Sequence, residues 1–259
     1  MLSSIIARWR NFKIKHYTFF EGRPLKHYKG IGNGGRCFII GNGPSLSADD
    51  LTKLYENKEK TFAFNRIFQI FPQTLWRPTY FISQDNLSLS TSGKEMGLIP
   101  AKAKFIPIES HWYDGINIDG ATYFHLVPNR DVDYGLFSND VSTCVYNSTT
   151  VAFTAIQFAV YMGFKEIYLL GVDHHFHTTR DRTGKIHVDE TAKDYFADDY
   201  NKLRQGEWLP NVDASTMAFD TARKYTETHG IKIYNATRGG KLEVFERVDF
   251  DSLFDVNER

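Results

Sequence analysis

Short apolar runs that each end in polar residues are the main pattern along this chain. Three of them cover residues 36–40, 61–64 and 79–83, and the polar residues that follow are Asn42, Asn65, Gln84 and Asp85. Runs of this length, rich in Ile, Phe and Tyr, predict buried strands. Because parallel strands end at the same edge of an open sheet, and such sheets bind ligands there, we expect the polar ends to form one site.

The first run enters a turn that suits an anionic ligand. Its residues are Gly41, Asn42, Gly43, Pro44 and Ser45. We expect positive φ angles at both glycines, while the proline stiffens the turn. Ser47, followed by Asp50 three positions later, predicts a helix start directly after the turn. A helix start behind a glycine turn binds phosphate, and the alternative is an ordinary strand-to-helix turn without a ligand.

A helix and a strand farther along the chain repeat this arrangement. Residues 151–162 carry apolar side chains at helical spacing on one face, and Gly163 ends the helix. Residues 165–173 predict a strand with a polar tip. At the helix start, hydroxyl and backbone N–H groups suit a phosphate or a carboxylate, and they belong to Ser148, Thr149 and Thr150.

The predicted elements amount to one α/β domain with a Rossmann-like, mostly parallel sheet and helices on both faces. The chain has 259 residues, 42% of them hydrophobic, which is enough for a sizeable core. We place the domain at residues 36–248, after a basic extension at 1–35 and before a tail at 249–259. Within it, we interpret residues 174–215 as an inserted lid.

The lid is rich in His, Asp and Tyr and has no sustained period. A long irregular insertion in a compact domain is usually functional or disordered, and the aromatic residues of this one argue against full disorder. We expect residues 208–213, which begin with Trp208, to fold over the bound ligand. The last helix is predicted over residues 219–225, and the glycines at 32–35 predict a flexible link before the first strand.

Charge is distributed unevenly although the net charge is zero. Residues 1–30 contain seven Lys and Arg against one Glu, seven minus one giving +6, so the remainder carries −6. Apolar residues lie at helical spacing among them, namely Leu2, Ile5, Ile6, Trp9 and Phe12. The segment predicts either peripheral contact with an anionic membrane or a terminal helix packed on the body or on a partner subunit. We expect no nucleic-acid partner.

Other signals concern the compartment and metals. Only Cys37 and Cys144 occur, and we expect both to be buried free thiols in a reducing compartment. No apolar run has the length of a membrane span and the N-terminus has no signal-peptide pattern, so we expect a cytoplasmic protein, with the inner face of the membrane as its peripheral site. The Cys and His residues lack the spacing of a zinc site, and we expect no metal.

Three segments resemble a known superfamily. They are Gly-Asn-Gly-Pro-Ser-Leu at 41–46, Met-Gly-Phe-Lys-Glu-Ile-Tyr-Leu-Leu-Gly-Val-Asp at 162–173, and Tyr-Asn-Ala-Thr-Arg-Gly-Gly-Lys-Leu-Glu-Val-Phe at 234–245. The first two resemble the bacterial family 42 sialyltransferases and equally the 6-hydroxymethylpterin diphosphokinase MptE-like family. The third is more similar to the end of the MptE-like domain. The resemblance spans roughly residues 36–248 and implies a GT-A-like variant of the fold.

The resemblance implies which residues contact the nucleotide. In the sialyltransferases the glycine loop and the strand-end asparagine contact the cytidine nucleotide, which implies this role for Asn42, Gly43 and Asn65. Gln84 and Asp85 align near another contact with the sugar nucleotide.

The identity of the catalytic base stays open at this point. The family's catalytic histidine aligns near Asp213, which has no histidine beside it, and His175 replaces a tyrosine of the family. Because histidine titrates near neutral pH, we rank His175 first and Asp213 second as the base. We expect Asp173 to position the histidine, with His174 as the second histidine candidate.

We therefore expect a glycosyltransferase that uses a nucleotide-activated sugar, CMP-linked and acidic, in bacterial surface polysaccharide or lipooligosaccharide assembly. Its partners are the sugar nucleotide and a glycan or lipid-linked acceptor, it requires no cofactor, and related enzymes commonly form homo-oligomers. One alternative is an ATP-dependent 6-hydroxymethylpterin diphosphokinase whose Mg²⁺ binds Asp85 and Asp173. Another is a nucleotide-binding module without turnover.

Overall fold

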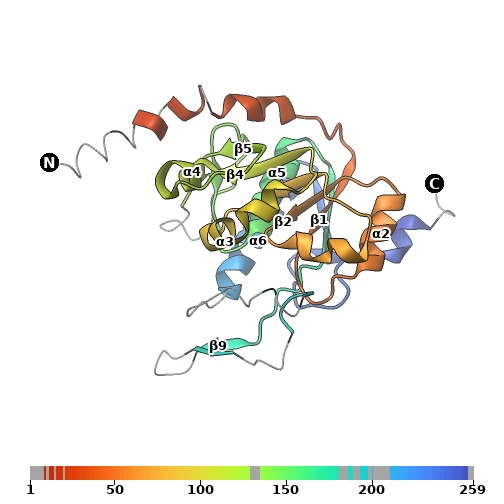
Figure 1. The fold of residues 1–259 in the computed structure, drawn as a ribbon. Coiled ribbons are helices and arrows are strands. Elements are labelled where there is room, and N and C mark those ends of the chain that lie inside the picture. The colour runs from red at the N-terminus through yellow and green to blue at the C-terminus, as the bar shows by residue number, and fades with distance from the viewer. Residues whose placement is uncertain are drawn as a thin grey trace.

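The fold is built on one large parallel sheet. A computed structural model describes residues 9, 12–14, 16–19, 21–128, 135–180, 186–188, 193–197, 200 and 211–255 (Figure 1). Eight strands form the sheet in the order β12-β11-β8-β1-β2-β3-β4-β5, and every neighbouring pair is parallel. This confirms the predicted α/β class.

The bounds of the strands in this sheet are β1 (Arg36–Ile40), β2 (Thr61–Phe64), β3 (Tyr80–Ile82), β4 (Ala103–Pro107), β5 (Ala121–Phe124), β8 (Glu166–Leu170), β11 (Lys232–Asn235) and β12 (Glu246–Arg247). Two small two-stranded sheets accompany it, one parallel, β6 (Leu126–Val127) with β7 (Val145–Tyr146), and one antiparallel, β9 (Thr178–Arg180) with β10 (Ile186–Val188).

The bounds of the helices are α2 (Ala48–Glu56), α3 (Asn86–Gly97), α4 (Ile108–Asp114), α5 (Val151–Tyr161) and α6 (Val212–Thr228), with 3₁₀ helices η1 (Arg23–Tyr28), η2 (Ile67–Gln73) and η3 (Asp251–Phe254). The helix predicted after the glycine turn is confirmed as α2, because Ser47 is its N-cap and accepts from the backbone N–H of Asp50.

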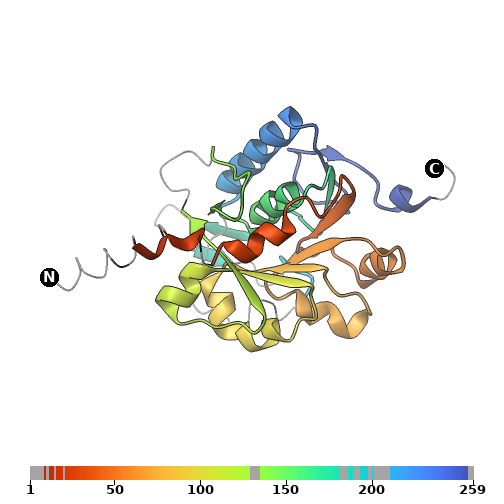
Figure 2. The ribbon, with the colours of Figure 1, turned by 90° about the horizontal axis from the view of Figure 1, so that it is seen from above.

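Helices cover both faces of the sheet, as predicted (Figure 2). Successive side chains of a strand point to opposite faces. In β1, Cys37 and Ile39 belong to the core cluster shared with α5 and α6, whereas Phe38 and Ile40 belong to the cluster shared with α2 and α3. The sheet therefore separates two hydrophobic layers.

The predicted strands are confirmed, with bounds shifted by a few residues at their ends. The strands predicted over residues 79–83 and 165–173 are longer than the observed β3 and β8. The polar residues that follow these strands lie in the loops beyond the sheet.

Helix α5 is buried on nearly all sides, so the predicted single apolar face is too narrow. Ten of its eleven residues are buried, including the polar residues Thr154 and Gln157. The helix packs on β1, β2 and β7 and also on α6, which leaves little of its surface for water. Gly163 after it has φ of +84°, which confirms the predicted left-handed helix end.

The last helix begins earlier than predicted, inside the segment that we interpret as a lid. Helix α6 begins at Val212 rather than near residue 219, so residues 212–215 are helical and Asp213 lies in the first turn. The insertion also contains the β9-β10 hairpin, which extends away from the body (Figure 1). Trp208 and the rest of residues 201–210 lie outside the described residues.

The N-terminal segment is partly packed on the body. Tyr17 and Leu25 are fully buried, and the Tyr17 hydroxyl donates to the carbonyl of Tyr123 at 3.1 Å. Trp9 and Phe12 are each 61% exposed. From residue 17 onward the segment thus follows the packed-helix alternative and forms no unit separate from the domain.

The predicted flexible link at 32–35 is wrong. The backbone N–H groups of Gly32 and Gly34 donate to the carbonyls of Met162 at 2.6 Å and Gly163 at 2.9 Å. These bonds fix the link to the turn after α5. Of the described helices, none is both long and apolar enough to cross a membrane.

Candidate functional site

The chain reverses direction across the sheet between β1 and β8. From β1 the chain adds β2 to β5 on one side, and after α5 it adds β8, β11 and β12 on the other. In open parallel sheets, the carboxyl ends of strands on either side of such a switch point diverge and leave a crevice that binds ligands. The glycine turn follows β1 and the predicted polar tip follows β8, so both lie at this crevice.

The two strand ends approach each other so closely that only glycine fits. The N–H groups of Gly41 and Gly43 donate to the carbonyls of Leu170 at 2.7 Å and Gly171 at 2.9 Å. A Cβ on Gly41 would collide with the Gly171 carbonyl, and one on Gly43 would lie 2.7 Å from the carboxyl carbon of Asp173. Neither glycine has a positive φ, so that prediction is wrong, and close backbone approach is the reason for both.

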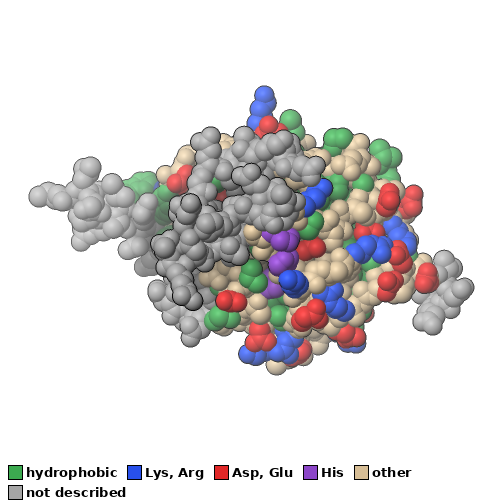
Figure 3. All heavy atoms as spheres, turned by 90° about the horizontal axis from the view of Figure 1, so that it is seen from below, with side chains coloured by type: hydrophobic (Ala, Val, Ile, Leu, Met, Phe, Trp, Pro, Cys, Tyr) green, Lys and Arg blue, Asp and Glu red, His purple; other side chains and the backbone are tan. Residues whose placement is uncertain are grey.

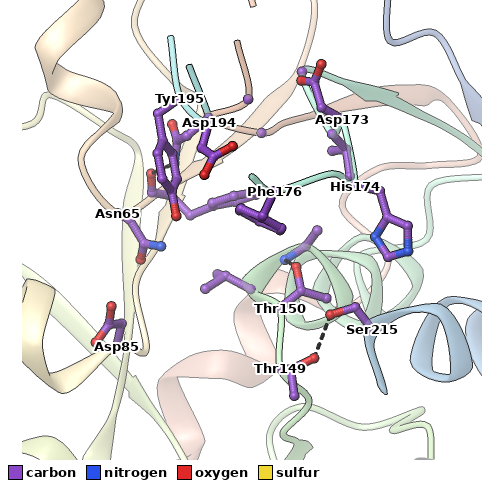
Figure 4. Close-up of a pocket in the computed structure, with 18 of the residues that line it drawn as sticks. Asn65, Asp85, Thr149, Thr150, Asp173, His174, Phe176, Asp194, Tyr195 and Ser215 are labelled. Atoms are coloured by element: carbon purple, nitrogen blue, oxygen red, sulfur yellow. Dashed lines mark hydrogen bonds between the residues drawn. The ribbon is translucent and has the colours of Figure 1, made fainter. Parts of the chain in front are cut away.

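A cavity of about 310 Å³ opens at this crevice (Figure 4). Twelve residues predicted from the sequence line it: Gly41, Asn42, Gly43, Asn65, Gln84, Asp85, Ser148, Thr149, Thr150, Asp173, His174 and His175. Three predicted residues do not line it, namely Pro44, Ser45 and Asp213. The structure therefore brings the ends of β1, β2, β3 and β8 and the start of α5 to one cavity, as the sheet-edge argument predicts.

Asp173 is held by the glycine turn rather than by a histidine. Its carboxylate accepts from the Ser45 hydroxyl at 2.7 Å and from the Ser45 N–H at 3.4 Å. Burial raises the pKa of the Asp173 carboxyl, although the bonds from Ser45 oppose the shift. Ser45 thus acts behind the cavity wall. The charge of His175 also lowers the pKa of the Asp173 carboxyl, and the predicted positioning of a histidine by Asp173 stays a prediction.

The loop after β11 supports the backbone of Asp173. The Lys241 N–H donates to the Asp173 carbonyl at 2.7 Å, and Gly240 lies so close that a Cβ would be 2.9 Å from the Asp173 Cα. Thr237 contributes from the same loop, because its hydroxyl accepts from the Val172 N–H at 3.2 Å. The closing motif at 234–245 therefore positions the tip of β8.

The histidines after β8 have separate partners. His174, which has φ of 54°, bonds through Nε2 to the Thr216 hydroxyl at 2.7 Å, and burial lowers its pKa. The ring of His175 lies 4.6 Å from that of His177. His177 in turn bonds through Nδ1 to the carboxylate of Asp194 at 2.7 Å. Histidine side chains are visible at the surface of this face beside the grey residues (Figure 3).

The predicted amide residues connect the strand ends. The Asn42 Nδ2 donates to the Phe64 carbonyl at 3.0 Å, while its buried Oδ1 has no partner among the described residues. Asn65, with φ of 54°, accepts from the Ser83 hydroxyl at 3.0 Å. Gln84 accepts from the Thr154 hydroxyl at 2.6 Å. These side chains fix the strand ends and also line the cavity.

The start of α5 is partly satisfied by its own hydroxyl groups. The Thr150 hydroxyl accepts from the Ala152 N–H at 3.3 Å, and Ser148 accepts from the Thr150 N–H at 3.2 Å. Thr149 bonds to the Ser215 hydroxyl of α6 at 2.5 Å. The positive end of the helix dipole still faces the cavity, which favours an anionic ligand there.

The two carboxylates proposed as magnesium ligands line the same cavity but lie apart from each other. Asp85 caps α3 by accepting from the Leu87 N–H and the Ser88 hydroxyl, each at 3.0 Å. Asp85 and Asp173 lie on opposite sides of the cavity (Figure 4). Among the described residues, no group of three or more His, Cys, Asp or Glu side chains could hold a metal ion. This arrangement does not fit a Mg²⁺ bridged by the two aspartates.

Several lining residues were not predicted as site residues. They are Phe64, Asn147, Val151, Ala152, Gly171, Val172, Phe176, Asp194, Tyr195, Tyr200, Ser215 and Phe219. Phe176, Tyr195 and Tyr200 belong to the insertion, whose sequence signals only that it contains aromatic residues. A residue in an irregular segment has no period that places it, so no sequence signal could have assigned these three to the cavity.

Comparisons with known proteins agree with the fold. The MAf glycosyltransferase from Magnetospirillum magneticum AMB-1 has a similar structure, with a TM-score of 0.52 and 16% identity over 85% of this chain and 34% of that one. A mammalian sialyltransferase in complex with Gal-beta-1-3GalNAc-ortho-nitrophenol matches with a TM-score of 0.30 and 11% identity over 80% of this chain and 70% of that one. The chain spans about a third of the first protein, and the likeness to that protein concerns the fold alone. A search of curated proteins gave no match.

The family match is broader at its start and shorter at its end than the resemblance predicted. The sequence model of the 6-hydroxymethylpterin diphosphokinase MptE-like family matches residues 10–179, which includes part of the basic extension and stops before the segment at 234–245. The similarity of that last segment therefore stays a prediction. Because the match covers more than half of the chain, this protein belongs to the 6-hydroxymethylpterin diphosphokinase MptE-like family.

Proposed function

We propose that the protein is a glycosyltransferase that uses a nucleotide-activated sugar, a CMP-linked acidic sugar, in bacterial surface polysaccharide or lipooligosaccharide assembly. The observation that carries the proposal is the cavity at the β1-β8 switch point. Its described lining offers amides, hydroxyls, backbone N–H groups, a helix start, two histidines and three aspartates, but no Lys or Arg. Such a lining suits a nucleoside monophosphate as leaving group better than a triphosphate, whose charge is commonly neutralised by Lys, Arg and Mg²⁺.

Each part of the cavity has its own role in the proposed reaction. The start of α5 binds the phosphate, while Asn65 and Gln84 orient the ribose or the sugar. His175 lines the cavity and takes the proton of the acceptor hydroxyl, whose oxygen then attacks the anomeric carbon of the donor. The bond from that carbon to the phosphate oxygen breaks, and the nucleoside monophosphate leaves with its electron pair. Asp213 is exposed and does not line the cavity, so we retain His175 as the base.

The family name supports a second candidate, an ATP- and Mg²⁺-dependent diphosphokinase acting on a pterin. That reaction places a metal ion between carboxylates and phosphates. The separation of Asp85 from Asp173 weighs against it (Figure 4). A binding module without turnover is the third candidate, and product formation distinguishes it.

A ligand panel tests the proposal. We expect CMP to raise the melting temperature of the full chain without Mg²⁺, and UDP, GDP and ATP to do so less, because a ligand that binds only the native state stabilises it. Released CMP from a CMP-linked acidic sugar then reports turnover. Selective stabilisation by ATP with Mg²⁺ would favour the diphosphokinase instead.

Two variants test whether CMP binds in this cavity. Asn65→Gly removes the carboxamide, and glycine accepts the φ of 54° without strain. We expect CMP affinity to fall by roughly 1 to 3 kcal/mol. Ser83→Ala removes the hydroxyl that Asn65 accepts from but keeps the carboxamide, so it is the matched control. Equal affinities in wild type and Asn65→Gly, measured by calorimetry, contradict the assignment.

A further inference from the structure

One wall of the cavity consists of aromatic rings from the insertion. The rings of Tyr195 and Tyr200 are stacked, with centroids 4.1 Å apart and planes at 5°, and Phe176 lies 6.2 Å from Tyr195. All three line the cavity. Tyr200 is only 3% exposed, whereas Phe176 and Tyr195 are half-buried. The wall therefore has a buried ring behind and two accessible rings in front.

Side chains and backbone at the ends of β1 and β2 hold this wall in place. The Tyr200 hydroxyl accepts from the Asn42 Nδ2 at 2.9 Å. The backbone carbonyl of Tyr200 accepts from the guanidinium of the buried Arg66. The Phe196 N–H donates to the Asn42 carbonyl at 3.1 Å. These bonds order the ring of Tyr200, on which Tyr195 stacks, so a ligand that stacks on Tyr195 bears less of the entropic cost of ordering the wall.

The opposite wall is polar and suits an anion. It contains the start of α5 with Thr149 and Thr150, and Ser215 of α6. In the close-up, Phe176 lies between Tyr195 on one side and Thr150 on the other (Figure 4). A ligand that spans the cavity thus meets aromatic rings at one end and a helix N-terminus at the other.

We propose that Phe176 and Tyr195 form a stacking subsite for the nucleobase of the donor, with its phosphate at the start of α5. The inference rests on the proposed function and names the part of the donor that each wall recognises. Stacking needs a planar heteroaromatic ring, and a nucleotide joins such a ring to a phosphate. The cavity of about 310 Å³ is at the small end for ligand sites, which suits one nucleotide.

The experiment compares a ligand that has the base with one that lacks it. Calorimetry on the full chain measures CMP and ribose 5-phosphate with wild type, Phe176→Leu and Tyr195→Leu, which keep apolar volume but lose the aromatic ring. We expect CMP affinity to fall on the order of tenfold to a hundredfold, the usual effect of losing a base stack, while ribose 5-phosphate affinity stays the same. Tyr195→Phe keeps the ring and should bind CMP like wild type.

The controls separate this inference from the proposed function. Tyr55→Leu removes a half-exposed tyrosine of α2 that does not line the cavity, so it should change neither affinity. Equal losses for CMP and ribose 5-phosphate in the cavity variants overturn the stacking subsite but leave nucleotide binding intact. If the variants lose affinity for 6-hydroxymethylpterin and wild type does not bind CMP, the wall holds a pterin, and both proposals fail.

Discussion

At the scale of single residues, Asp173 shows most clearly that the site is not optimised for stability. Burial raises the pKa of its carboxyl, and that carboxyl lies at the crevice against Ser45 and the glycine turn. A carboxyl whose charged form is disfavoured costs stability at neutral pH, and such groups are common at functional sites. The cavity thus keeps an unfavourable group where a ligand can use it.

Asparagine at this position should therefore stabilise the fold. The usual pKa of the carboxyl is 3.8, and the folded value lies above it. As pH rises, the unfolded chain loses this proton before the folded protein does. The free energy of unfolding therefore falls between pH 3.8 and the folded pKa, and it has lost the whole contribution of this group above the folded pKa. Asp173→Asn keeps an acceptor for Ser45, so we expect it to be more stable than wild type at pH 7, with a difference that shrinks as pH approaches 3.8.

Urea unfolding of both proteins across this pH range measures the effect. Asp119→Asn is the control, because Asp119 is an exposed carboxylate outside the cavity. A difference between Asp173→Asn and wild type that is the same at every pH would show that the change acts through packing and not through the proton.

At the scale of elements, the sequence predicts the buried strands well. It predicts poorly those elements whose extent depends on contacts with distant parts of the chain. We could predict β1, β2, β3 and β8 from the sequence, because a strand buried in a parallel sheet has a continuous apolar stretch. The start of α6 was missed, although Asn211 caps it by accepting from the Ala214 N–H and the buried face begins at Ala214 and Ser215. Small residues such as these two give little hydrophobic signal, so the prediction began only at Phe219.

The same reasoning explains which site residues were predicted. Residues that follow a strand, such as Asn65 and Gln84, were found because the strand places them at the sheet edge. Tyr195 and Asp194 were not assigned to the site, because they reach the cavity through contacts that have no local pattern, such as the bond from Asp194 to His177. The reason why Gly41 and Gly43 must be glycine was also predicted wrongly. It is the close approach of β1 to β8, which depends on two segments that are distant in sequence.

Helix α5 depends on one buried polar side chain. Gln157 is fully buried, and its Oε1 accepts from the N–H groups of Ser138 and Tyr146, each at 3.0 Å. Its Nε2 donates to the Tyr146 carbonyl at 2.9 Å. The side chain forms the backbone hydrogen bonds that a neighbouring strand would otherwise provide. It thereby attaches the segment that contains β7 to the helix.

Gln157→Leu should destabilise the protein although it adds apolar volume. The change leaves two backbone N–H groups and a carbonyl without partners, and each unsatisfied buried group costs about 1 to 3 kcal/mol. We expect a loss of about 3 kcal/mol in the free energy of unfolding, measured with urea. Gln73→Leu, the same substitution at an exposed position of η2, should change it by less than about 0.5 kcal/mol. Equal effects at the two positions would refute the role of Gln157.

At the scale of the whole molecule, ion pairs attach the C-terminal segment to the body. Arg238 donates to both oxygens of the buried Asp50 and to Asp251, and Lys53 pairs with Asp251 at 2.9 Å. These bonds raise the pKa of Arg238 and lower that of Asp251. The network joins α2 to η3 and also holds the loop that supports Asp173, so segments nearly 200 residues apart in sequence share one anchor.

The other end of the chain has a different character. Its fully buried residues start at Tyr17, whereas Trp9 and Phe12 are exposed aromatic residues. Lys13 lies between them and the body, because its Nζ is 4.9 Å from the centre of the Trp9 ring and 5.0 Å from that of Trp112 in α4. Removing residues 1–30 would strip the buried Tyr17 and Leu25 from the core and confound any test of membrane contact. Removing residues 1–13 takes away Arg8, Arg10 and Lys13, a charge of +3, and leaves these buried residues in place.

We expect this shorter truncation to bind anionic vesicles about a hundredfold more weakly than the full chain, because each basic residue near an anionic surface contributes about 1 kcal/mol. Flotation with phosphatidylglycerol vesicles measures the difference, and neutral phosphatidylcholine vesicles should show little binding by either protein. A variant with Lys60, Lys94 and Lys102 changed to Ala loses the same charge from exposed positions elsewhere and should bind like the full chain. If the truncation and this variant lose affinity equally, net charge explains the binding. If neither loses affinity, the basic residues of the N-terminal segment have no role in membrane binding.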